Sequence, residues 1–121
     1  MYEGAVILES LRVGGSLEGI PLVVRKISRS AVDGTTPDQP SVWTILEFEV
    51  DDNHAGPLAD ALLELLTRPG WYADFHNDRE IFVVFPDRVF RYPRGDHTAR
   101  SAAQEHGRSL GIPEPQLDWT D

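Results

Sequence analysis

The stretch Trp71–Phe85, WYADFHNDREIFVVF, decides how this chain is expected to fold. Residues 81–85 (IFVVF) contain no polar side chain, which is typical of a central strand that is covered on both faces of its sheet. Apolar and polar residues alternate in residues 71–75 (WYADF) instead, as in a strand with one solvent-exposed face. The segment HNDR lies between these two parts or bends them. We therefore predict two extended segments, the second of them central in a sheet.

The polar residues of this stretch form the first candidate site. Tyr72, Asp74 and His76 lie at every second position, so their side chains point the same way, about 7 Å apart along a strand. A carboxylate beside an imidazole can support it as a base, and the pair can offer two ligands to a metal such as zinc. Either role needs further residues. The pattern alone therefore favours the solvent-facing side of a strand whose odd-numbered residues hold the core.

Shorter extended segments flank this stretch on both sides. Residues 19–30 and 41–52 are predicted strands, residues 89–92 form a hairpin with residues 81–85, and residues 3–13 form a short strand or an ordered arm. Residues 30–41 are dense in Asp, Gly, Pro, Thr and Ser, which predicts a flexible loop.

Two segments carry the periodicity of helices. In the first, leucines recur at three- and four-residue spacing after a cap at Asp52 or Asn53, with Pro57 in the first turn and Pro69-Gly70 at the end. The second begins at the natural cap Asp96, carries an alanine-rich stripe and ends at Gly111. Residues 113–121 are a tail that we expect to pack on the domain through its Leu and Trp side chains.

These elements predict one α+β domain over residues 1–121. The simplest arrangement is a single antiparallel sheet of four to five strands with two helices packed on one face, in the order (β)ββαββα. Such a sheet leaves its second face uncovered. We expect Trp43, Ile45, Tyr72 and Arg91 to line that open face.

Composition narrows the classes of function. Twenty acidic and eleven basic residues give a net charge of −9, which disfavours nucleic acid as a partner because phosphates repel such a surface. The absence of cysteine excludes disulfides, thiolate metal sites and cysteine nucleophiles. No apolar run approaches the roughly 18 residues of a membrane span, and the first residues do not read as a signal peptide. We therefore expect a cytoplasmic protein without a membrane partner.

Two charged groups are weaker candidates. Acidic residues surround His54 where a strand meets a helix, and a solvated strand end with a helix cap explains them better than a calcium loop; they are Glu47, Glu49, Asp51 and Asp52. Arg88, Arg91 and Arg94 lie on the hairpin and could bind an anion, although pairing with nearby acids is the simpler interpretation. Of these arginines, Arg91 and Arg94 are kept as candidate binding residues.

The chain contains no nucleophile elbow, phosphate-binding glycine loop, dinucleotide fingerprint or HExxH motif. We therefore expect no cofactor and no metal, and the balance is against an enzyme. The amino-acid sequence resembles that of a family of small, uncharacterised bacterial proteins from GC-rich actinobacterial genomes. The resemblance is carried by residues 71–96, by VWTILEFE (42–49) and by GIPEPQLDW (111–119). The resemblance implies a stand-alone cytoplasmic protein and no catalytic residue.

The leading hypothesis is a non-enzymatic binding or protein-interaction module that self-associates as a homodimer through the open sheet face, or binds a small molecule or protein there. It rests on the supply of aromatic residues, which include Trp43 and Tyr72. The rival hypothesis is a small hydrolase or lyase that uses Asp74 and His76 with Tyr72 in a pocket. A closed pocket containing His76 and a second titratable group favours the enzyme, whereas a flat apolar face favours the module.

Overall fold

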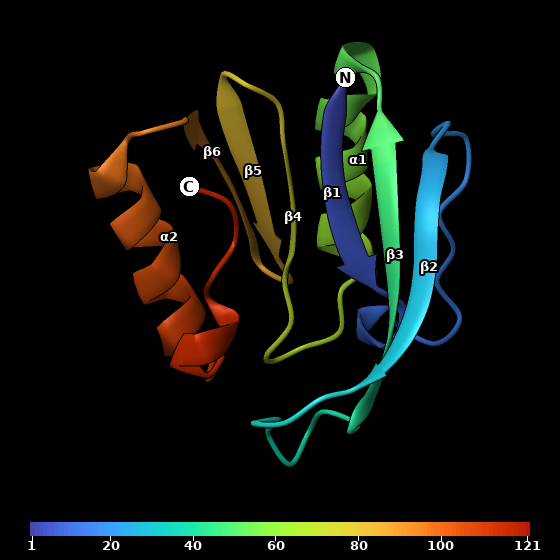
Figure 1. Cartoon of the computed structure of the whole chain (residues 1–121), viewed down its shortest axis with the longest axis vertical. Helices are drawn as coiled ribbons and strands as arrows, with labels where there is room; N and C mark the ends of the chain where they lie inside the picture. The colour runs from blue at the N-terminus through green and yellow to red at the C-terminus, as the bar shows by residue number, and fades with distance from the viewer.

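The computed structural model describes residues 1–121 and contains three strands and a helix in each half of the chain (Figure 1). The strands are β1 (Tyr2–Ile7), β2 (Val23–Ala31), β3 (Val42–Val50), β4 (Ala73–His76), β5 (Glu80–Phe85) and β6 (Arg88–Pro93). The helices are α1 (Asp52–Leu65) and α2 (His97–Ser109), with short 3-10 turns at Leu8–Ser10 and Glu114–Gln116.

All six strands form one antiparallel sheet in the order β2-β3-β1-β4-β5-β6. The predicted α+β class with one antiparallel sheet and two helices is confirmed. The predicted count of four to five strands is wrong, because both uncertain segments are full strands. Residues 2–7 insert between β3 and β4, so that Glu3 is paired with Glu49 on one side and with His76 on the other. Residues 73–76 pair with both β1 and β5.

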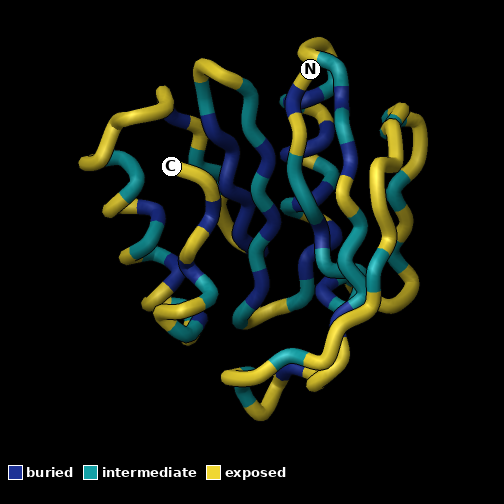
Figure 2. Tube along the Cα trace, viewed as in Figure 1, coloured by how far each residue is buried: buried dark blue, intermediate teal, exposed yellow.

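Strand β5 is the most deeply buried element, as its all-apolar sequence predicts (Figure 2). Phe82 and Val84 pack in the same cluster as α1, whereas Val83 and Phe85 pack with Ala103 of α2. Since successive side chains of a strand point to opposite faces, the two helices lie on opposite faces of the sheet. Figure 1 shows α1 behind β1 and β3, with α2 and the C-terminal tail on the other side. We name these two sides the α1 face and the α2 face.

The prediction that both helices pack on one face is therefore wrong. Its physical reason lies in β5, because a strand without polar side chains needs apolar cover on both faces and a single helix covers only one. The α1 face is closed by Leu58 and Leu62 against Phe48 and Phe75. The α2 face is closed over β5 by the alanine stripe of α2 and by the tail.

The helix ends follow ordinary capping chemistry. The cap of α1 is Asp51, whose carboxylate accepts from the backbone N–H of His54 at 3.0 Å, so the predicted cap at Asp52 or Asn53 is wrong by one or two residues. Pro57 consequently lies inside the helix and not in its first turn. Asp96 caps α2 as predicted, accepting from the Ala99 N–H at 3.0 Å.

The tail returns across the domain after α2. Gly111 has a φ of +84° and allows the chain to reverse, as its predicted role requires. Leu117 and Trp119 are buried against the α2 face, and the Trp119 indole N–H donates to the Tyr92 hydroxyl at 2.7 Å. The loop between β2 and β3 reaches this tail, since the side-chain amides of Gln39 and Gln116 bond to each other at 2.9 and 3.1 Å.

Candidate functional site

The α2 face is divided into two unlike halves. Helix α2 and the tail cover β5 and β6 and reach β4, and we call this the covered half. Strands β1, β3 and β2 have no helix on this side, and we call this the open half. Its residues follow from the register, since Ala5 lies beside Asp74 and Glu47, and Ile45 lies beside Ile7.

A cavity of about 400 Å³ lies at the boundary between the halves, and we call it the aromatic cavity. Its floor is formed by β1, β3 and β4, and its walls by the β2–β3 loop, the segment before β4 and the tail. A cavity of this size is within the usual range for small-molecule sites. The lining residues are Ala5, Ile7, Val32, Asp33, Gly34, Trp43, Ile45, Gly70, Trp71, Tyr72, Asp74, Pro115, Gln116 and Asp118.

Two tryptophans form the rigid wall of the aromatic cavity. The rings of Trp43 and Trp71 have centroids 5.3 Å apart at an interplanar angle of 59°. The Trp43 indole N–H donates to the Pro40 carbonyl at 2.9 Å, which fixes the orientation of that ring. Both residues are largely buried and pack in the larger hydrophobic cluster, Trp43 from the α2 face of β3 like Ile45, so their positions are set by the core.

Asp74 is the deepest charged group of the aromatic cavity. Its carboxylate takes part in no hydrogen bond or ion pair within the chain, and it is half-buried at the cavity floor. Burial first, and then the nearby Asp118 carboxylate, raise its pKa from the ordinary 3.8 to about 7, whereas Arg100 acts in the opposite direction. Asp74 is therefore a carboxylic group that can exchange a proton near neutral pH.

Tyr72 stands in the same file but has a structural role. Its hydroxyl donates to the backbone carbonyl of Gln116, and its ring meets Trp119 edge-to-face with centroids 5.3 Å apart. Burial, with the charge of Asp74 as the next cause, raises the pKa of Tyr72 well above its usual value. The phenol is thus committed to holding the tail, and it presents its ring to the cavity.

His76 lies in a second cavity of about 380 Å³, which we call the acidic cavity. The two cavities share Ala5, Ile45 and Asp74. The His76 side chain is 15 % exposed, its Nε2 lies 3.5 Å from the Glu3 carboxylate, and its Nδ1 is buried without a partner. Burial and then the charge of Arg94 lower the pKa of His76, so the imidazole is neutral at pH 7.

The predicted alternation of this strand is confirmed, because Trp71, Ala73 and Phe75 are buried in the core of the α1 face. The predicted solvent-facing character of the other side is wrong. Tyr72, Asp74 and His76 are all half-buried, because the tail returns over β4 and encloses that file.

The arginines of the hairpin do not converge on a common point. Arg91 is paired across the hairpin with Phe82, which places it on the α1 face, so the prediction that it lines the open face is wrong. There its guanidinium donates to Glu80 at 3.0 and 2.7 Å. Arg94 donates to the backbone carbonyls of Asp121 and Asn77 at 3.2 and 3.1 Å. The face on which Arg91 lies could not be predicted, because β5, its partner strand, has no polar side that would distinguish its two faces.

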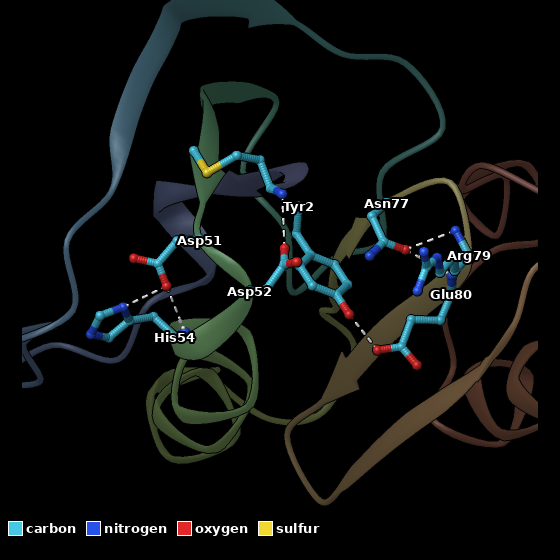
Figure 3. A network of polar contacts seen from close by, with 8 residues as sticks. Tyr2, Asp51, Asp52, His54, Asn77, Arg79 and Glu80 are labelled. Atoms are coloured by element: carbon cyan, nitrogen blue, oxygen red, sulfur yellow. Dashed lines mark hydrogen bonds and ion pairs between the residues drawn. The ribbon is translucent and has the colours of Figure 1, made fainter.

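The acidic group around His54 has the predicted structural use. Asp51 contacts both the His54 backbone N–H and its ring Nδ1, the latter at 2.7 Å, at the start of α1 (Figure 3). Figure 3 also shows the Tyr2 hydroxyl directed at Glu80, which joins β1 to β5 on the α1 face. No three His, Asp or Glu side chains are arranged to hold a metal ion.

Sequence reasoning missed the contribution of the tail to the site. Leu117 and Trp119 point into the covered half, so the alternate residues Gln116 and Asp118 face the aromatic cavity. The alternation of these tail residues is visible in the sequence, but the sequence does not tell on which strand the tail packs. Trp43 and Tyr72, the other two candidate binding residues, both line the aromatic cavity.

Comparisons with protein-family models, with curated proteins and with solved structures find no match to this chain. The resemblance to an actinobacterial family therefore stays a prediction. Neither helix is long and apolar enough to cross a lipid bilayer. The functional argument consequently depends on the geometry of the two cavities.

Proposed function

We propose that this protein is a non-enzymatic binding module whose site for a small molecule is the aromatic cavity. The observation that carries the proposal is a pair of tryptophans that lines the same cavity as a carboxylate without a partner of its own. Apolar walls with a few convergent polar groups are the usual composition of ligand sites.

The unpaired state of Asp74 supports a ligand more strongly than the cavity volume does. Even a half-buried carboxylate is costly to the folded state when it is ionised without a hydrogen bond, and most buried polar groups find a partner within the chain. Arginines are present nearby, yet Arg100 and Arg94 are directed at backbone carbonyls of the tail. An external partner for Asp74 would offset the cost of burying it.

A homodimer through the open half is less well supported than a ligand. Glu3, Glu47 and Glu49 lie on that surface, and a two-fold axis would bring like charges together. Glu47 and Glu49 have cationic neighbours, Lys26 at 4.0 Å and Arg25 respectively, whereas Glu3 lies beside the neutral imidazole of His76. Light scattering tests self-association, because a mass near 13.5 kDa at micromolar concentration rejects the dimer.

A small hydrolase or lyase is the second candidate function. One observation favours it, namely the pKa of Asp74 near 7, which suits a general acid or base. Against it, the Tyr72 hydroxyl is engaged with the tail, and Tyr72 does not line the acidic cavity that Asp74 and His76 share. Turnover of any compound found to bind, lost on Asp74→Asn with binding retained, would favour this candidate over the binding module.

The proposal is tested by NMR titration with a library of small aromatic and aliphatic fragments. Fragments that enter the aromatic cavity should shift the indole N–H signals of Trp43 and Trp71, and leave that of Trp119 nearly unchanged. The blocking variant is Ile45→Trp, which fills the cavity floor. Its matched control is Ile27→Trp on β2, where the side chain is 60 % exposed and distant from the cavity lining. Binding that survives Ile45→Trp would reject this site.

A further inference from the structure

We infer that the ligand of the aromatic cavity is a small organic cation, a protonated amine or quaternary ammonium on an apolar body. Its charged group would lie against Asp74, and its apolar body against Trp43 and Trp71. The inference deepens the proposed function and rests on it. It depends on the charges of the lining residues, on the contacts of Arg100 and on the chemistry of the aromatic wall.

Every charged residue that lines the aromatic cavity is acidic. Asp74 lies on the floor, while Asp33 and Asp118 are exposed at the rim on opposite walls. No lysine, arginine or histidine is among the lining residues. An anionic ligand would be repelled by the two rim carboxylates on entry and again by Asp74 inside the cavity. A cation would be attracted at each of these positions.

The adjoining acidic cavity extends the same field. Its charged lining residues include Glu3, Glu47 and Glu49, together with Asp74. The one arginine there, Arg25, is already paired with Glu49. Neutral His76 adds no positive charge to this surface.

Arg100 is the positive charge that acts on Asp74, and its guanidinium is engaged elsewhere. Its guanidinium donates to the Thr120 carbonyl at 3.1 Å and lies over the Trp119 ring at 5.3 Å from the centroid. Asp121 is a further neighbour at 3.9 Å. Arg100 therefore holds the tail in place and leaves Asp74 without a direct ion pair.

The wall chemistry selects an organic cation over a metal ion. Tryptophan is the best aromatic partner for a cation, with an attraction that increases when water is excluded. The tilted Trp43–Trp71 pair lines the same cavity as the Asp74 carboxylate, and aromatic rings are what protein sites for alkylated ammonium groups use. Divalent cations require several oxygen ligands at short range, and the lining here is half apolar.

Three compounds with the same phenyl body separate the possibilities: 2-phenylethylamine, 2-phenylethanol and phenylacetate. At pH 8 and low salt, NMR titration should show the amine binding about tenfold more tightly than the alcohol, with phenylacetate the weakest. The Trp43 and Trp71 indole signals should report all binding. Asp74→Asn should reduce amine binding to the level of the alcohol and leave alcohol binding unchanged. Asp60→Asn, which removes an equal charge from the exposed side of α1, should change neither.

The outcomes distinguish the two proposals. If the alcohol or phenylacetate shifts the two indole signals with an affinity equal to that of the amine, the cation inference is overturned and the binding site stands. The inference is likewise overturned if Asp60→Asn weakens amine binding as much as Asp74→Asn does, since the attraction would then be only net charge. If none of the three compounds moves either indole signal at millimolar concentration, both proposals fail.

Discussion

The covered and open halves of the α2 face belong to one continuous sheet, yet their side chains differ sharply. On the covered half, Ile81, Val83 and Phe85 are almost fully buried beneath α2 and the tail. On the open half, the equivalent row on β3 begins with half-buried Ile45 and continues to exposed Glu47. The cavities form where these two surfaces meet, because the tail reaches β4 and stops there.

The comparison teaches that one face of a sheet can serve stability and recognition at once. The covered half binds its own chain, through apolar contacts that need no further partner. The open half retains exposed carboxylates, which keep this surface hydrated and favour the binding of a cation. Asp74 stands at the border, enclosed like a core residue but charged like a surface one.

The largest expected effect is on the covered half. Phe85→Ala should lower the free energy of unfolding by about 4 kcal/mol, since this ring is fully buried between Tyr72, Trp119 and α2. Ile45→Ala on the open half should cost about 1 kcal/mol, because its side chain is only half-buried. Urea unfolding followed by circular dichroism measures both. Equal losses would contradict the division into two halves.

The seam between β1 and β4 should be nearly as sensitive. A Cβ added to Gly4 would lie 2.6 Å from the Phe75 Cβ and would also overlap the Asp74 backbone carbonyl, and neither atom can move freely. Gly4→Ala should therefore cost about 3 kcal/mol. Gly56→Ala in α1 is the matched control, because no atom lies within 4 Å of its Cβ and helix propensity favours alanine by up to about 1 kcal/mol. Thermal unfolding of the two variants should shift in opposite directions.

Asp74→Asn should stabilise the protein in a pH-dependent manner. The pKa of Asp74 is raised to about 7 in the folded state, so folding favours its protonated form, and the wild type loses stability as pH rises from about 4 to 7. The variant lacks this loss and should be about 2 kcal/mol more stable at pH 8, and equal to wild type near pH 4. Asp60→Asn should show no such dependence. A wild-type advantage at pH 8 would show that Asp74 has a cationic partner within the fold.

The smallest effect is expected for His76→Ala. The only polar contact of the imidazole is the Glu3 carboxylate, at 3.5 Å, and its buried Nδ1 has no partner, so the variant loses one weak polar contact and removes an unsatisfied atom. We expect a change within about 0.5 kcal/mol of wild type in urea unfolding. A loss several times larger would indicate a buried hydrogen bond, as an acid–base site requires.

Much of the local structure was predictable from the sequence. The all-apolar run 81–85 predicted a strand covered twice, and the leucine spacing of residues 58–66 predicted α1. Capping by Asp96 and reversal at Gly111 were readable because both depend on local backbone chemistry. The alternation of residues 71–76 was also correct, since side-chain facing along a strand has a period of two.

The long-range arrangement was not predictable in the same way. Nothing in residues 2–7 specifies that they pair with both β3 and β4, because strand pairing is a property of two distant segments. The opposite placement of the helices follows from the all-apolar β5, whereas the order of elements alone is equally compatible with both helices on one face. The candidate site was predicted in part. The candidates Trp43, Tyr72 and Asp74 do line one cavity, but Asp118 was missed because it reaches the cavity only through the return of the tail.

The pairing of Gln39 with Gln116 has a consequence for how the chain responds to a bound molecule. These residues are 77 positions apart in sequence, and their amides join the loop wall and the tail wall of the aromatic cavity. A ligand that contacts both walls would link these distant parts of the chain reversibly. Occupancy should then protect the last residues from carboxypeptidase digestion, although no ligand need contact the scissile bonds.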